Sequence, residues 1–114
     1  MNEINLVKHL IKLYDIGKKN GLLQLEDYFD EYYKNPVYSY CLRLALDCDK
    51  DDFLNITKYL SINRSREENI IIKGFELING KNYTIIEVAK ILGAMLEYPK
   101  FHYELLDNSK TNEK

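Results

Sequence analysis

The sequence has 114 residues, of which 46% are hydrophobic and 30% are charged, and its formal net charge is −2. A chain of this size and composition forms one folded domain rather than a disordered segment. Its charge disfavours nonspecific binding to nucleic acid. Acidic Glu3, with Lys8 and Lys12 after it, interrupts any apolar leader segment. Every apolar run is far shorter than the roughly 20 residues that span a bilayer, so we expect a cytoplasmic chain without a membrane span.

Apolar residues at three- and four-residue spacings predict an amphipathic first helix over residues 4–19. Its stripe comprises Ile4, Val7, Leu10, Ile11 and Tyr14. Asn20-Gly21 then ends the helix, because glycine takes the left-handed conformation that closes a helix without a side-chain penalty. His9 lies beside the stripe, where we expect a packed or surface residue rather than a metal ligand.

A second helix is predicted from Leu22 to Tyr33 or Lys34. Its inner stripe comprises Leu22, Leu25, Phe29 and Tyr32. Tyr28 and Tyr33 lie on its flanks. These two tyrosines either contribute to a protein-binding surface or pack with the hydroxyl group at the water boundary.

The junction between these helices places opposite charges around one tight corner. Lys18 and Lys19 fall in the last turn of the first helix, and Glu26 and Asp27 fall early in the second. Both placements suit the helix dipole, so solvated end charges are one interpretation. The other is a partner-binding site. We call the four residues the charged corner and take them as the candidate site.

Asn35-Pro36 predicts the start of a third helix, with asparagine as cap and proline at the first helical position. Apolar residues then recur at helical spacing and suggest a central helix. They are Val37, Tyr40, Cys41, Leu44 and Cys48, with Leu42, Ala45 and Leu46 widening the arc. Two cysteines seven residues apart on one helix are separated by about 10 Å and cannot form a disulfide. We expect two small buried side chains and no metal site.

An acidic run follows, at Asp47, Asp49, Asp51 and Asp52. It superficially suggests a calcium loop, but Lys50 and Phe53 break the required pattern of a central glycine and a distal glutamate. We interpret the acids as the cap and first turn of a fourth helix over residues 51–62. Its inward residues are predicted to be Phe53, Ile56, Leu60 and Tyr59.

Two capping boxes, Ser65 with Glu68 and Thr84 with Glu87, predict helices over residues 66–78 and 85–98. The isoleucines at positions 70–72 also permit a strand, but a lone short strand would lack partners. Pro99 ends the sixth helix. The inner face of that helix is predicted to contain Ile85, Val88, Ala89, Leu92 and Leu96.

These elements together predict an all-α fold, a single small bundle of five or six helices with short loops. The domain is expected to cover residues 1–103, and the polar residues 104–114 are expected to form a disordered tail. The sequence contains no glycine-rich phosphate loop, nucleophile elbow or paired catalytic histidine. We therefore expect a non-enzymatic protein with no cofactor and no small-molecule substrate.

Residues 84–93 match the first helix and turn of a helix-turn-helix through Val88-Ala89 and Leu92-Gly93. The following residues 94–99 lack the basic side chains that a recognition helix needs. Nucleic-acid binding is therefore disfavoured. A small regulatory or adaptor protein of helix-turn-helix descent, binding protein or DNA, is the alternative interpretation.

One further pattern begins at Lys18-Lys19-Asn20-Gly21-Leu22-Leu23-Gln24-Leu25-Glu26. Asn35-Pro36-Val37-Tyr38 and the segment Leu42 to Asp49 follow it. In this order the segments resemble the cytoplasmic segment of the MotA family of flagellar stator proteins. The likeness covers about residues 5–78, is most specific over residues 13–49, and lacks the family's membrane helices.

The resemblance implies a charged interaction with the flagellar motor. In that family, a basic and an acidic residue face an oppositely charged helix of the rotor protein FliG. The basic position falls on Lys18 and the acidic one on Glu26. Lysine replaces the family's usual arginine, which keeps the charge but loses the forked hydrogen bonding. The expected partner is therefore a protein, FliG or a stator component.

Overall fold

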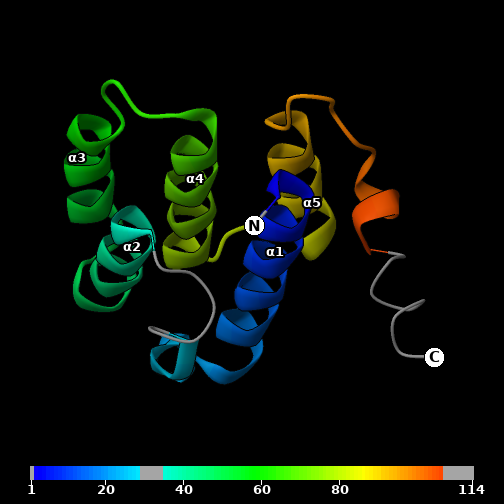
Figure 1. Cartoon of the computed structure of the whole chain (residues 1–114). Coiled ribbons are helices and arrows are strands. Elements are labelled where there is room, and N and C mark those ends of the chain that lie inside the picture. Colours follow the sequence, from blue (N-terminus) through cyan, green and yellow to red (C-terminus); the bar gives the residue numbers. More distant parts are fainter. Residues whose placement is uncertain (1, 29–34, 107–114) are drawn as a thin grey trace.

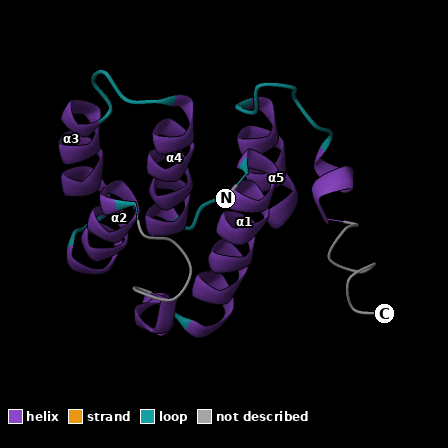
Figure 2. Ribbon diagram, in the orientation of Figure 1, coloured by secondary structure: helices purple, strands orange, loops and turns teal. Residues whose placement is uncertain are grey.

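Every regular element in the described part of the chain is helical. The computed structural model describes residues 2–28 and 35–106, and Figure 2 shows helices and loops without a strand among them. In chain order the elements are α1 (Glu3–Asn20), η1 (Leu22–Tyr28), α2 (Pro36–Asp47), α3 (Lys50–Leu60), α4 (Arg66–Gly80) and α5 (Ile85–Ala94). The predicted all-α class is confirmed. None of these helices is both long enough and apolar enough to cross a bilayer.

Helix α4 is the centre of the bundle. It packs against α1, α2, α3 and α5, and Figure 1 shows α2 and α3 on one side of it and α1 and α5 on the other. The prediction of a central helix after Pro36 is wrong, because α2 packs mainly against α4 and η1. Residues 70–72 are buried in α4, since consecutive helical residues point in different directions and α4 has neighbours around it. The helical prediction for these isoleucines is confirmed.

Helix α2 contributes Tyr38 to the core. Tyr38 is fully buried and meets the ring of Phe75 edge to face, with 5.2 Å between ring centroids. The sequence prediction selected Tyr40, which is 49% exposed, and this assignment is wrong. The stripe runs instead through Tyr38, Cys41 and Ala45, at spacings of three and four residues that keep one helix face inward.

Side-chain caps start the helices, and all of them except the cap at Asn2 were predicted. The side chains that accept a backbone N–H at a helix start are those of Asn2, Asn35, Asp49, Ser65 and Thr84. Ser65 and Thr84 form complete capping boxes with Glu68 and Glu87. Asp49 caps α3, which confirms that the acidic run starts a helix.

Helix α3 buries a smaller face than predicted. Phe53 is fully buried, but Tyr59 is 69% exposed, so its inward assignment is wrong. Thr57 lies inward instead, and its hydroxyl donates to the Phe53 carbonyl at 3.0 Å. This bond satisfies the threonine hydroxyl within its own helix, so a polar residue can occupy the buried stripe.

The predicted second α-helix is wrong over residues 22–28, where the chain forms the 3-10 helix η1. Three of its apolar residues lie three apart, at Leu22, Leu25 and Tyr28, and pack on the core, whereas Leu23 is 73% exposed. That spacing matches the three residues per turn of a 3-10 helix, so this geometry brings all three to one face. The remaining residues of the prediction, Phe29 to Lys34, lie outside the described part.

Helix α5 ends at Ala94, before the predicted Tyr98. The chain turns back there, and the Gly93 carbonyl accepts the Lys100 N–H at 3.3 Å. A Cβ atom on Gly93 would lie 2.7 Å from the Lys100 carbonyl oxygen, so only glycine permits this approach. Residues 102–106 form a further helical turn, in which Leu105 is 2% exposed. The packed region therefore extends past residue 103, the last residue of the predicted domain.

Candidate partner-binding site

The charged corner lies where α1 passes into η1. Gly21 has φ 94° and ψ 155°, and its N–H donates to the Gly17 carbonyl at 3.0 Å. The positive φ was predicted, although the extended ψ differs from a left-handed helical residue. Glycine adopts this conformation readily because it has no Cβ. The Leu22 side chain packs closely on Gly17, since a Cβ atom added to this glycine would lie 3.1 Å from Leu22 Cδ2.

Lys18 is exposed but has a structural partner. Its Nζ donates to the carbonyl of Tyr83, in the loop between α4 and α5. The same Nζ lies 5.6 Å from the centre of the Tyr14 ring. The Tyr14 hydroxyl also donates to the Tyr83 carbonyl and accepts the Tyr83 N–H at 2.9 Å. Lys18 therefore helps to attach this loop to α1, a role that the sequence prediction missed.

Lys19 is the more accessible cation of the corner. Its Nζ lies 3.2 Å from an Asp15 carboxylate oxygen, and its side chain is 70% exposed. An exposed pair of this kind, four residues apart on one helix, contributes only about 0.3–0.5 kcal/mol. Lys19 can therefore exchange Asp15 for a partner's carboxylate at little cost.

The acidic half of the corner lies on η1. Glu26 and Asp27 are exposed, and no hydrogen bond or ion pair holds either carboxylate within residues 2–28 and 35–106. Leu23, on the same short element, is 73% exposed. The corner thus combines accessible cations, accessible anions and one exposed apolar side chain.

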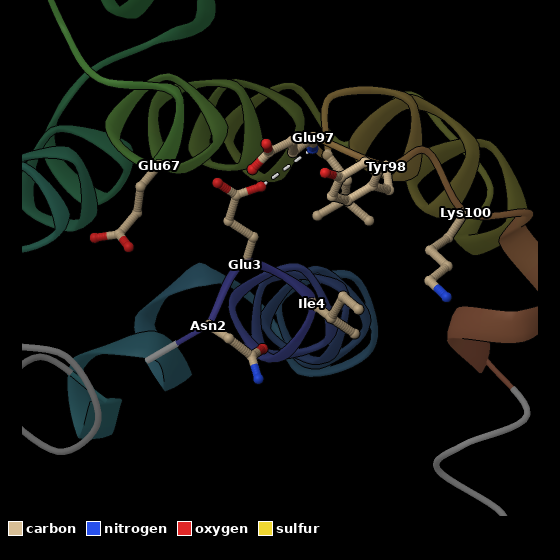
Figure 3. Close-up of a pocket in the computed structure, with 8 residues that line it drawn as sticks. Asn2, Glu3, Ile4, Glu67, Glu97, Tyr98 and Lys100 are labelled. Carbon is tan, nitrogen blue, oxygen red and sulfur yellow. Dashed lines mark hydrogen bonds between the residues drawn. The ribbon is translucent and has the colours of Figure 1, made fainter.

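A second surface lies at the opposite end of α1 and was not predicted from the sequence. It is an open cleft of about 590 Å³ between the start of α1 and the segment after α5 (Figure 3). Its lining residues are Asn2, Glu3, Ile4, Glu67, Leu96, Glu97, Tyr98 and Lys100. We call it the Tyr98 cleft. Its lining residues come from both ends of the described chain, from Asn2 to Lys100, so no local motif marks it.

An ion-pair network forms one wall of the Tyr98 cleft. The Arg66 guanidinium donates to Glu3 at 3.0 Å and to the Glu97 carboxylate at 2.9 Å. The Glu97 backbone N–H also donates to Glu3 at 3.2 Å (Figure 3). This network joins the start of α1, the start of α4 and the chain after α5.

His9 is a core residue. The sequence predicts either a packed or a surface residue, and the structure shows the packed one. It is 5% exposed, and its Nε2 lies 2.7 Å from the Tyr38 hydroxyl. Burial, and secondarily the nearby charge of Lys12, lowers the pKa of His9 from 6.5 to about 4. The imidazole is therefore neutral at physiological pH and connects α1 to α2.

Both cysteines are free thiols. Cys41 is buried as predicted, and burial raises its pKa to about 12, which leaves it protonated and unreactive at neutral pH. Cys48 is only partly buried. Among the described residues, no group of three or more histidine, cysteine and acidic side chains could hold a metal ion.

The helix-turn-helix pattern does not continue into a basic helix. The described chain after α5 forms only the turn over residues 102–106, whose residues are His102, Tyr103, Glu104, Leu105 and Leu106. This turn has no lysine or arginine to contact phosphates. Comparison of the chain with protein-family models, with curated proteins and with solved structures finds no match.

Proposed function

We propose that this chain is a non-enzymatic protein-interaction domain that binds a protein partner through the charged corner. The observation that carries this proposal is the composition of the corner. Exposed Lys19, exposed Glu26 and Asp27, and the 73% exposed Leu23 lie on two consecutive elements around Gly21. An apolar contact within a polar, solvent-accessible rim is the usual arrangement of a protein interface.

The charges would act mainly on partner choice and association rate. Exposed ion pairs add little affinity, but complementary charges steer encounter and fix the orientation of the complex. Leu23 would supply the apolar contact that excludes water at the centre. Lys18 has a smaller part in this proposal, because its amine already donates to the Tyr83 carbonyl.

Following the resemblance to the MotA cytoplasmic segment, we propose the flagellar rotor protein FliG as the partner. The charged helix through which FliG meets that family would face Lys19 and Glu26 here. The basic contact thereby moves by one residue from Lys18, the position that the resemblance implies. A stator component is the other partner that the resemblance implies.

The test is binding of the purified chain to purified FliG, measured by calorimetry at low and high salt. Lys19→Glu and Glu26→Lys should each weaken binding at least about three-fold, since a reversal replaces attraction with repulsion. Lys90→Glu and Glu104→Lys make the same charge changes at exposed positions away from the corner. These controls should bind like the wild type.

Two results would count against the proposal. Equal binding by all five proteins would keep FliG as partner but exclude the charged corner as the surface. Absence of binding to FliG and to the stator cytoplasmic segments would exclude the motor partner. Circular dichroism should first establish that each variant has the wild-type helix content.

A further inference from the structure

The Tyr98 cleft has an excess of carboxylates beside an exposed aromatic ring. Three glutamates line it, Glu3, Glu67 and Glu97, and the cations near them are Lys100 and Arg66, which pairs with Glu3 and Glu97. Tyr98 is 78% exposed, the highest value among the large hydrophobic side chains of residues 2–28 and 35–106. Figure 3 shows Glu97 and Tyr98 on the segment after α5, with Glu3 reaching from α1 to the Glu97 backbone and Ile4 beside Glu3 on α1. Carboxylates and an accessible ring together favour a cationic ligand.

The ion-pair network leaves part of Glu97 available. Arg66 is held by both Glu3 oxygens and reaches Glu97 only through Oε1. Within the described chain no group bonds the Glu97 Oε2 atom, and the Glu97 side chain is 56% exposed. A carboxylate accepts about four hydrogen bonds. Glu97 can therefore bind a second guanidinium while it keeps Arg66.

We propose that the Tyr98 cleft binds an arginine side chain from an extended segment of a protein partner. The guanidinium would donate to Glu97 Oε2 and stack on the face of Tyr98, as its planar shape allows. The neighbouring apolar residue of the partner would contact Ile4 and Leu96, which also line the cleft. The carboxylate of Glu97 supplies the charge complementarity that selects arginine.

Further exposed rings extend this surface beyond the cleft. Phe101 is 67% exposed and Tyr103 is 53% exposed. Their rings are stacked, with 5.8 Å between centroids and 2° between planes. Three exposed aromatic side chains thus lie within six residues of the sequence, and exposed aromatic side chains are enriched at protein-binding sites. They favour a peptide over a free small cation as the occupant.

This surface is separate from the charged corner. The cleft lies at the start of α1 and the corner at its end, and α1 has 18 residues. At 1.5 Å per residue the two ends are about 27 Å apart. The inference therefore does not depend on the proposed FliG contact, and one domain could bind two protein segments at once.

The test is titration of the ¹⁵N-labelled chain with the peptide acetyl-Ala-Arg-Leu-Ala-amide, followed by NMR. The amide signals of Glu97 and Tyr98 should shift, with a dissociation constant of about 1 mM, as suits a short peptide. The same peptide with citrulline in place of arginine keeps the shape without the charge. It should bind about three- to five-fold more weakly.

Variants of the chain test the two proposed contacts. Glu97→Gln and Tyr98→Ala should each weaken binding of the arginine peptide about three- to five-fold. Glu104→Gln and Tyr59→Ala are the matched controls at exposed positions outside the cleft and should leave binding unchanged.

Four results would overturn the inference. Two concern affinity: equal affinity for the arginine and citrulline peptides, or wild-type affinity of both cleft variants. Two concern the NMR signals: shifts confined to other surfaces, or no shift at a peptide concentration about ten times the expected dissociation constant. Sedimentation of the chain alone tests a second copy as occupant. Self-association that Tyr98→Ala abolishes would replace the arginine segment with a second copy of this chain.

Discussion

The hydroxyl group of Tyr14 forms two hydrogen bonds with the backbone of Tyr83, donating to its carbonyl and accepting from its N–H. The two residues are 69 positions apart, and Tyr14 is 1% exposed. This contact attaches the loop before α5 to the middle of α1. The Lys18 amine donates to the same carbonyl, so the corner and the loop share one anchor.

Tyr14→Phe should lower the free energy of unfolding by about 1–2 kcal/mol. The Tyr83 carbonyl keeps Lys18 as donor, whereas the Tyr83 N–H loses its protein acceptor, and an unsatisfied donor is the costly part. Urea unfolding followed by circular dichroism measures the change. Tyr59→Phe removes an exposed hydroxyl and should change stability by less than about 0.5 kcal/mol. An equal effect of the two substitutions would contradict the account of the Tyr14 contact.

Stability should fall as the pH is lowered from about 6.5 towards 4, because of His9. The folded-state pKa of His9 is lowered to about 4, so the unfolded chain takes up a proton in this window and the folded chain does not. The expected slope approaches 1.4 kcal/mol per pH unit, or about 3 kcal/mol over the whole window. Urea unfolding between pH 5 and 7 measures it with little interference from carboxylates.

His9→Gln supplies the control for this pH dependence, because glutamine does not titrate and can still hydrogen-bond Tyr38. The variant should be less stable than the wild type at pH 7 and should lose most of the slope between pH 5 and 6.5. If wild type and variant show the same slope, another group is responsible.

Substitution by alanine should have opposite effects on stability at two glycines of α4, Gly74 in the core and Gly80 at the end of the helix. On Gly74 a Cβ would lie 2.7 Å from Leu10 Cδ1, so Gly74→Ala should push α1 from α4 and cost about 1–3 kcal/mol. At Gly80 nothing lies within 4 Å of the added Cβ. Gly80→Ala should be neutral or stabilise by up to about 1 kcal/mol, through the lower entropy of the unfolded chain. Thermal unfolding of both variants measures the difference. Destabilisation by Gly80→Ala as large as that by Gly74→Ala would contradict the open space around Gly80.

Much of the fold could be predicted because its determinants are local. Ser65 with Glu68 and Thr84 with Glu87 lie three residues apart, and each pair satisfies backbone groups of its own helix. The errors arose where tertiary contacts decide. Tyr38 and Tyr40 are both compatible with helical spacing, and only packing against Phe75 selects Tyr38.

The two candidate sites also differ in whether their residues are adjacent in the sequence. The charged corner could be located because Asn20-Gly21 and its flanking charges are adjacent in the sequence. The hydrogen bond from Lys18 to Tyr83 depends on the folded position of a distant loop, so the sequence did not indicate it. The Tyr98 cleft likewise requires Glu3, Arg66 and Glu97 to meet from three separate segments.

The most direct test of the charged corner as a docking surface is NMR mapping of the proposed contact with FliG. The ¹⁵N-labelled chain would be titrated with unlabelled FliG, and the change in each amide signal would be followed. We expect the largest changes at Lys19, Gly21, Leu23 and Glu26, with smaller changes at high salt. Changes confined to other surfaces, or no change at all, would contradict this expectation.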